Sequence, residues 1–179
     1  MAERSTAPLW AMRGLYAGLC LFILFLQLMP LDTVPKGWAG PNLMLALTFA
    51  WAVRRPEYVP ALLVAALFLL SDLLLHRPPG LFAALAVLGS QTLRGRAPDL
   101  RDLTFAVEWL SMLTTTAALM IGYRVVLSLL MVDQAPLGLS IMEFAMTVLI
   151  YPVVVVASHL LFGVRKVAPG ELDAMRPTP

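Results

Sequence analysis

Long apolar runs, separated by proline, glycine or charged residues, govern what this chain can fold into. A helix needs roughly 20 mostly apolar residues to cross the hydrocarbon core of a bilayer, which is about 30 Å thick. Six runs approach or exceed this length, at residues 11–29, 38–53, 57–75, 79–93, 104–131 and 137–163. We therefore expect an all-α membrane protein, a bundle of six transmembrane helices joined by tight loops.

The composition agrees with a chain that is surrounded by lipid. Of the 179 residues, 60% are hydrophobic and only 13% are charged, whereas soluble domains carry about 25% charged residues. The apolar runs use nearly the whole length. We expect one membrane domain over residues 1–166, a cytoplasmic tail over residues 167–179 and no soluble catalytic domain.

No sequence motif points to an enzyme or to a cofactor. The sequence lacks P-loop, HExxH and GxSxG patterns, and its single cysteine, Cys20, cannot form an internal disulfide or a CxxC metal site. Its basic residues stand singly or in pairs despite the net charge of +2, so they do not suggest a nucleic-acid surface. We expect no catalytic residue, no cofactor, no metal and no nucleic-acid partner.

The distribution of basic residues predicts the orientation, because short cytoplasmic loops keep Lys and Arg. Of the thirteen Lys and Arg residues, one alternating set of loops and termini holds ten: Arg4, Arg13, Arg54, Arg55, Arg94, Arg96, Arg101, Arg165, Lys166 and Arg176. The opposite set holds Lys36 and Arg77, and Arg124 falls inside a run. This asymmetry predicts an inner-membrane protein with both termini in the cytoplasm.

Two of the runs, 38–53 and 79–93, are shorter than a bilayer core requires at 1.5 Å per residue. Short segments flanked by Gly and Pro sometimes border a substrate cavity in transporters. Local thinning of the bilayer, with arginines reaching the interface, is the simpler explanation, and we favour it.

Five ionisable residues lie within the apolar runs: Asp72, Glu108, Arg124, Glu143 and His159. Such residues are normally paired, functional or close to an interface. In a hairpin of the last two runs, Arg124 lies level with Glu143, and Glu108 lies level with His159. The two pairs fall on nearly opposite sides of each helix, so one flat interface cannot hold both. We favour Arg124 with Glu143 as a structural ion pair.

Asp72 and Arg77 mark the outer end of the third run. The simpler interpretation is an interfacial carboxylate that is solvated or paired with Arg77. The functional interpretation is a contact with a partner or a ligand.

Two further features are candidates for partner binding. Gly14 and Gly18 form a GxxxG pattern, which permits close helix approach within the protein or onto a partner's helix. Arg54 and Arg55 are expected to face cytoplasmic partners or anionic lipid, together with Arg94 and Arg96.

Several short motifs resemble the MreD family of bacterial rod-shape-determining membrane proteins. They are Pro41-Asn42-Leu43, Ala50-Trp51-Ala52-Val53, Arg54-Arg55-Pro56-Glu57, Leu69-Leu70-Ser71-Asp72-Leu73-Leu74 and Pro79-Gly80-Leu81. Chain length and the number of runs fit as well. The resemblance implies a non-enzymatic scaffold of the cell-elongation complex, which supports peptidoglycan synthesis and rod shape. It also implies MreC as the direct partner, and MreB, RodA and its partner transpeptidase as members of the complex.

The resemblance also defines an alternative function. The family's fold is similar to the substrate-binding subunits of energy-coupling-factor vitamin transporters, which bundle six helices around an outward cavity. A small-molecule-binding transport subunit would need convergent polar or aromatic groups at the outer mouth. Aromatic residues are sparse around the candidate polar residues, so we place the scaffold first.

Overall fold

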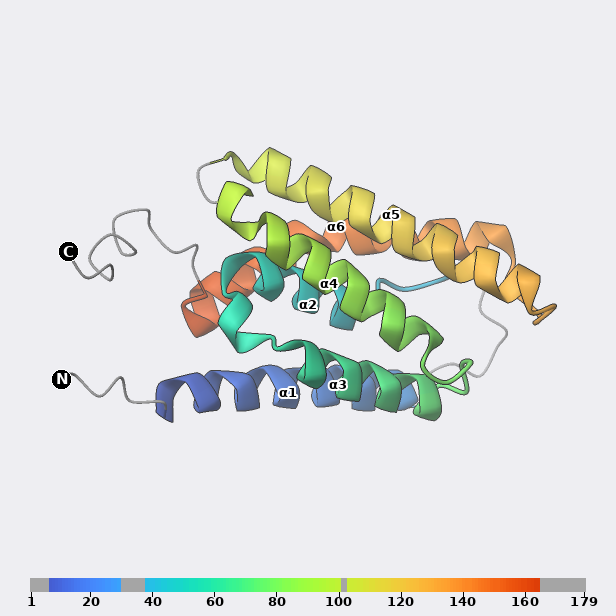
Figure 1. Cartoon of the computed structure of the whole chain (residues 1–179), viewed down its shortest axis with the longest axis horizontal. Helices are drawn as coiled ribbons and strands as arrows, with labels where there is room; N and C mark the ends of the chain where they lie inside the picture. Colours follow the sequence, from blue (N-terminus) through green and yellow to red (C-terminus); the bar gives the residue numbers. More distant parts are fainter. Residues whose placement is uncertain (1–6, 30–37, 101–102, 165–179) are drawn as a thin grey trace.

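The computed structural model describes residues 7–29, 38–100 and 103–164, and this part of the chain is all helical (Figure 1). The predicted tail over residues 167–179 and the basic residues Arg4, Lys36, Arg101, Arg165, Lys166 and Arg176 lie outside the described residues. The helices are α1 (Ala7–Leu28), α2 (Leu43–Arg54), the 3-10 turn η1 (Pro56–Tyr58), α3 (Ala61–Leu74), α4 (Leu81–Leu100), α5 (Phe105–Leu129) and α6 (Leu137–Phe162).

Each predicted apolar run corresponds to one of these α-helices, and three of them are long and apolar enough to span a membrane. They are α1 over Leu9–Leu28, α5 and α6. Helices α2 and α3 are apolar but shorter. For the described residues, the coarse expectation of a helical chain with helices able to span a membrane is therefore confirmed.

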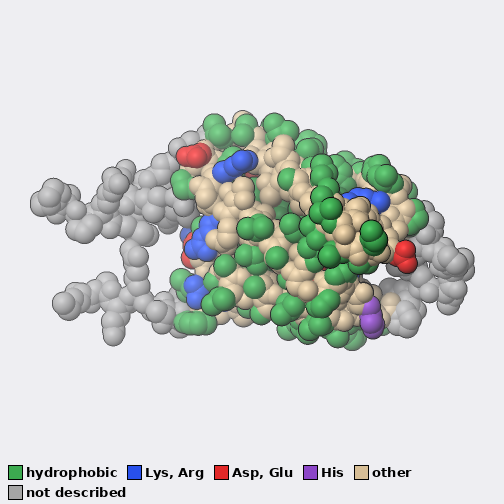
Figure 2. Space-filling model, turned by 45° about the vertical axis from the view of Figure 1, so that its right-hand side comes forward, with side chains coloured by type: hydrophobic (Ala, Val, Ile, Leu, Met, Phe, Trp, Pro, Cys, Tyr) green, Lys and Arg blue, Asp and Glu red, His purple; other side chains and the backbone are tan. Residues whose placement is uncertain are grey.

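The helices run up and down in one bundle (Figure 1). We call the end at which α1 begins and α6 finishes the near end. The opposite end, which holds the α3–α4 and α5–α6 turns, is the far end. Helix α2 lies at the centre and contacts α1, α4 and α6, while α4 also contacts α3 and α5. Figure 2 shows hydrophobic side chains across the middle of the visible face and charged side chains toward both ends.

Helix α2 is only 12 residues long and every residue from Met44 to Val53 is buried. At 1.5 Å per residue it measures about 18 Å, well short of a bilayer core. Polar links hold it to its neighbours, because Trp51 Nε1 donates to Ser158 Oγ at 3.0 Å and the Tyr16 hydroxyl lies 2.8 Å from Thr48 Oγ1. This helix is a core element of the protein rather than a helix that faces lipid.

A non-helical segment over residues 38–42 precedes α2 and lengthens the part of the chain that lies inside the bundle. Backbone N–H groups that lack helical partners need other acceptors inside a membrane. The N–H of Asn42 donates to Thr147 Oγ1 at 2.9 Å, and the N–H of Ala39 donates to Met142 Sδ at 3.3 Å. The run predicted as a helix over 38–53 is thus a non-helical segment followed by a short helix, both in contact with α6.

Helix α4 extends further than its apolar run of 79–93 predicts, since it continues to Leu100. Leu93, Ala97 and Leu100 are buried and follow one another at spacings of four and three residues, which places them on one helix face. Packing of this face stabilises the helix across the polar stretch around Arg94 and Arg96. Both of these arginines are exposed at the near end, as expected.

Candidate functional site

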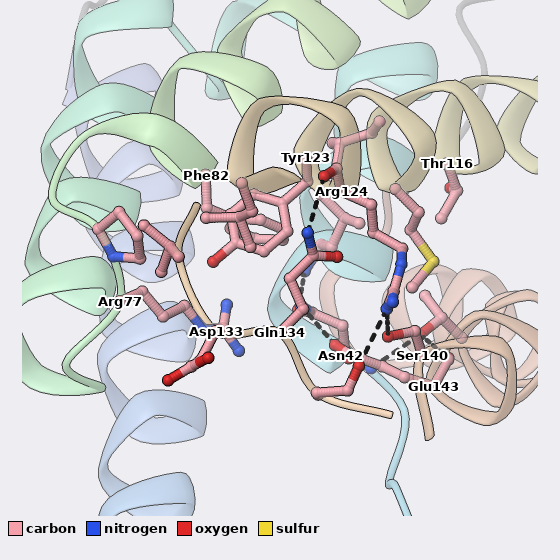
Figure 3. A pocket seen from close by; sticks show the side chains of 18 of the residues that line it. Asn42, Arg77, Phe82, Thr116, Tyr123, Arg124, Asp133, Gln134, Ser140 and Glu143 are labelled. Atoms are coloured by element: carbon pink, nitrogen blue, oxygen red, sulfur yellow. Dashed lines mark hydrogen bonds between the residues drawn. The ribbon is translucent and has the colours of Figure 1, made fainter. Parts of the chain in front are cut away.

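The far end of the bundle contains a cavity of about 330 Å³ among α2, the α3–α4 turn, α5 and α6 (Figure 3). We call it the far-end cavity. Its volume lies at the lower end of the range of small-ligand sites, roughly 300–1,000 Å³. Apolar walls come from residues such as Phe82 and Leu119, and the polar lining includes Asn42, Arg77, Tyr123, Arg124, Asp133, Gln134, Ser140 and Glu143.

Arg124 and Glu143 both line this cavity, but the ion pair expected between them is not formed in the described part of the chain. The Arg124 guanidinium donates to Ser140 Oγ at 2.7 Å and to the carbonyl oxygen of Ala135 at 3.2 Å. Ser140 lies about one turn before Glu143 on α6, so the arginine meets the hydroxyl and the turn carbonyl first. The prediction of matching depth identified the right region and the wrong partner.

Asn42 connects Glu143 to the start of α2. Its Nδ2 donates to Glu143 Oε1 at 3.4 Å, and its Oδ1 accepts from the backbone N–H of Leu45 at 3.1 Å, which caps the helix. The backbone N–H of Asn42 also donates to Thr147. Asn42 therefore holds the segment over residues 38–42, the N-terminus of α2 and the Glu143 carboxylate in place.

Asp72 is fully buried, so its expected roles as a solvated interfacial carboxylate or as a contact with a partner are wrong. Its Oδ2 accepts from the backbone N–H groups of Gly80 and Ala83, both at 3.1 Å. Gly80 immediately precedes α4 and Ala83 lies in its first turn, where backbone N–H groups have no intrahelical acceptors. Asp72 therefore joins the end of α3 to the beginning of α4.

Arg77, the other candidate on this turn, lies above the ring of Phe82. The guanidinium carbon is 4.9 Å from the ring centroid, within the range of a cation–π contact. Arg77 lines the far-end cavity, and Figure 3 shows it on the same side as Asp133. It remains a candidate for binding a partner or a ligand.

A second polar cluster lies inside the near end, where Glu108 is 0% exposed. Arg54 donates to its two carboxylate oxygens, from Nε at 3.1 Å and from Nη2 at 3.3 Å, and the Tyr151 hydroxyl donates to Oε1 at 3.0 Å. This bidentate pair joins α2, α5 and α6. Glu108 thus uses Arg54 rather than His159, the residue at matching depth.

The two neighbouring arginines therefore have different environments. The Arg54 side chain is 12% exposed and turned inward to Glu108, so its expected place on the cytoplasmic surface is wrong. Arg55 keeps an outward position, with its Nη1 3.4 Å from Glu57 Oε1.

Gly14 and Gly18 lie on an outward face of α1, where an added Cβ would meet no atom within 4 Å. Exposed apolar residues such as Phe22 and Phe25 continue this face. Of the two interpretations of the GxxxG pattern, the structure excludes close packing within the described chain and leaves the face open.

Neither the Arg54–Glu108–Tyr151 cluster nor the roles of Asn42 were predicted from the sequence. A signal was present for the first, because a glutamate in an apolar run needs a cation and Arg54 ends a run at the same level. Asn42 has the residue type and the position of an N-cap, immediately before an apolar helix.

Among the described residues, no three His, Cys, Asp or Glu side chains come together in a way that would bind a metal ion. Comparisons with protein-family models, with curated proteins and with solved structures find no match to this chain.

Proposed function

We propose that this chain is a six-span protein of the bacterial inner membrane, with both termini in the cytoplasm, that acts as a non-enzymatic scaffold of the MreD type. Its direct partner in this proposal is a single-helix protein like MreC. MreB, RodA and the partner transpeptidase of RodA belong to the same complex.

The observation that carries the proposal is the use of the charged residues inside the bundle. Asp72 caps α4, and Arg54 and Glu108 tie α2 to α5, so these groups hold helices together rather than facing a substrate. A rigid bundle with short turns suits a protein that presents fixed helix faces to partners. The motifs that resemble MreD fall on these joints, around Asn42, Arg54 and Asp72.

The outward face of α1 suits a partner that also spans the membrane. Helix association in lipid depends on close backbone approach at small residues, because hydrophobic exclusion from water is absent there. Gly14 and Gly18 provide such a surface, with no atom of the described chain against it. We assign this face to the transmembrane helix of the MreC-like partner.

A membrane-spanning role for all six helices is supported by how the short ones are accommodated. Helix α2 is enclosed by protein and prolonged by the segment over residues 38–42, and α3 follows the η1 turn. Each therefore has more chain at membrane depth than its helical part alone.

The far-end cavity favours the second candidate function, a small-molecule-binding subunit similar to those of energy-coupling-factor transporters. The cavity has the convergent polar groups that such a subunit needs, including Arg77, Arg124 and Glu143, and Phe82 and Tyr123 add aromatic walls. We keep the scaffold first because the sequence motifs support it.

Co-purification tests the proposal. The tagged full-length protein is extracted from its own membranes in a mild detergent, and the proteins that accompany it are identified by mass spectrometry. We expect an MreC-like protein and cell-wall synthases. Recovery of ATPase subunits and a transport partner instead would replace the scaffold with the transporter function.

A matched pair of variants tests the assigned surface. Gly18→Leu fills the open face of α1, whereas Gly138→Leu adds the same side chain at an exposed site in the first turn of α6, where an added Cβ also meets no atom within 4 Å. We expect Gly18→Leu to reduce recovery of the MreC-like protein and Gly138→Leu to leave it unchanged. Equal recovery from both would remove the α1 face from the proposal.

A further inference from the structure

The far-end cavity adjoins an apolar groove on the outside of the bundle. This groove, of about 230 Å³, runs between α5 and α6 and is lined by side chains that include Ala117, Ile121, Ile141 and Phe144. We call it the α5–α6 groove. Met120, Arg124 and Ser140 line both the groove and the far-end cavity, so the two spaces lie side by side with the Arg124–Ser140 contact between them.

The cavity carries balanced charge. Figure 3 shows Arg77 and Asp133 on one side and Arg124 and Glu143 on the other, so each side has one guanidinium and one carboxylate. A purely anionic or purely cationic ligand would meet repulsion from two of these groups. A zwitterion, with its opposite charges a few atoms apart, can satisfy one group of each sign.

The groove carries no charge of its own apart from Arg124 at its edge. Its residues point to the surrounding medium, since Ile121 is 64% exposed and Ile141 is 59% exposed. In a bilayer such a furrow between two spanning helices is filled by hydrocarbon. A single molecule that occupied both spaces would need a zwitterionic head and an apolar chain.

We propose that the far-end cavity and the α5–α6 groove together bind one zwitterionic phospholipid with a primary amine in its headgroup. The phosphate lies between Arg77 and Arg124, because guanidinium groups match phosphate oxygens in pairs. The ammonium approaches Glu143 and Asp133, and an acyl chain follows the groove along Ile121. This inference rests on the proposed membrane location and is independent of the scaffold role.

The polar groups at the junction are already held in place. Arg124 is fixed by Ser140 Oγ and by the carbonyl of Ala135, and Glu143 is fixed by the side-chain amide of Asn42. Groups that are ordered before the ligand arrives lose little conformational freedom on binding.

Native mass spectrometry of the delipidated full chain in detergent micelles measures the binding directly. Three probes are added separately: phosphatidylethanolamine, phosphatidylglycerol of the same acyl chains, and water-soluble phosphoethanolamine. We expect phosphatidylethanolamine to bind about tenfold more tightly than phosphatidylglycerol, the size of one hydrogen bond to a charged group. We expect phosphoethanolamine alone to bind too weakly to compete.

Two variants on one helix test the groove. Ile141→Trp blocks it, whereas Leu149→Trp places the same bulk at a site on α6 that is 63% exposed and lies outside the groove. We expect Ile141→Trp to lower the affinity for phosphatidylethanolamine about tenfold or more and Leu149→Trp to leave it unchanged. Both positions face outward, so both variants are expected to fold, which circular dichroism verifies.

A third variant tests the headgroup. Glu143→Gln keeps the shape of the side chain and removes one of the two carboxylates that face the ammonium, so the preference for phosphatidylethanolamine over phosphatidylglycerol should fall, and adding Asp133→Asn should abolish it. Equal binding of the two lipids by the unmodified chain would overturn the proposal. So would tight binding of phosphoethanolamine that survives Ile141→Trp, which would identify a soluble ligand. Neither result depends on whether an MreC-like partner is recovered.

Discussion

Among the described glycines, Gly89 on α4 has the least room for an added Cβ. A Cβ there would lie 2.7 Å from Cζ and 3.2 Å from Cε1 of Phe49 on α2, and 3.3 Å from Cγ2 of Thr115 on α5. The Phe49 ring is fully buried and cannot move into solvent. Overpacking of this kind destabilises by about 1–3 kcal/mol. Gly→Ala in a helix interior returns about 0.5–1 kcal/mol. From the middle of these two ranges, we expect Gly89→Ala to lower the free energy of unfolding by about 1 kcal/mol.

The assay is reversible unfolding in mixed micelles with increasing sodium dodecyl sulfate, followed by circular dichroism. Gly14→Ala is the control, because its Cβ meets nothing within 4 Å and the helix gains propensity. A second change, Phe49→Leu, shortens the side chain that the new Cβ at position 89 would contact. Phe49→Leu should therefore destabilise the Gly89→Ala variant less than it destabilises the unmodified protein. If Gly89→Ala is as stable as Gly14→Ala, the close approach of α2 and α4 is incorrect.

Three further predictions concern the polar contacts. Arg54→Leu should destabilise the protein by about 3 kcal/mol, and adding Glu108→Leu should recover part of the loss. The same unfolding assay measures both; a loss in the double variant equal to the sum of the two single losses would contradict the pairing. Arg124 and Glu143 bond to different partners, so the losses of unfolding free energy caused by Arg124→Leu and Glu143→Leu should add within about 0.5 kcal/mol. A double variant much more stable than this sum would show that the two residues form an ion pair after all. Asp72→Ala removes the cap of α4 and should lower stability by about 1–2 kcal/mol, with hydrogen exchange rising first at the start of that helix. Intact protection there would argue against capping.

The helices themselves could be predicted because their signal is local. Runs of apolar residues bounded by Pro, Gly or charge located all six, and α5 (Phe105–Leu129) and α6 (Leu137–Phe162) agree with the runs 104–131 and 137–163 within a few residues. The boundaries failed where tertiary packing decides. The segment over residues 38–42 can be non-helical because α6 supplies hydrogen-bond acceptors for its N–H groups. Helix α4 continues to Leu100 because its buried face continues.

The polar contacts were harder to predict because each depends on a choice among several partners at one level. Depth along a hairpin limited the candidates for Glu108 and Arg124, but not the direction of their side chains. Arg54 lies on a helix outside that hairpin, so the comparison of the last two runs could not include it. The GxxxG pattern drew attention to Gly14, while the close helix approach occurs at Gly89, which no sequence pattern distinguishes.

The central claim is a bundle that crosses the membrane six times, and it can be tested by labelling single cysteines in a chain whose native cysteine is replaced. Far-end sites are Met29, His76 and Asp133, and near-end sites are Glu57 and Arg96. A membrane-impermeant maleimide is applied to intact spheroplasts and again after the membrane is opened. We predict that all far-end cysteines label from outside and that near-end cysteines label only after the membrane is opened. Two results would contradict the six-span topology: labelling of a near-end site from outside, or a far-end site that labels only after the membrane is opened.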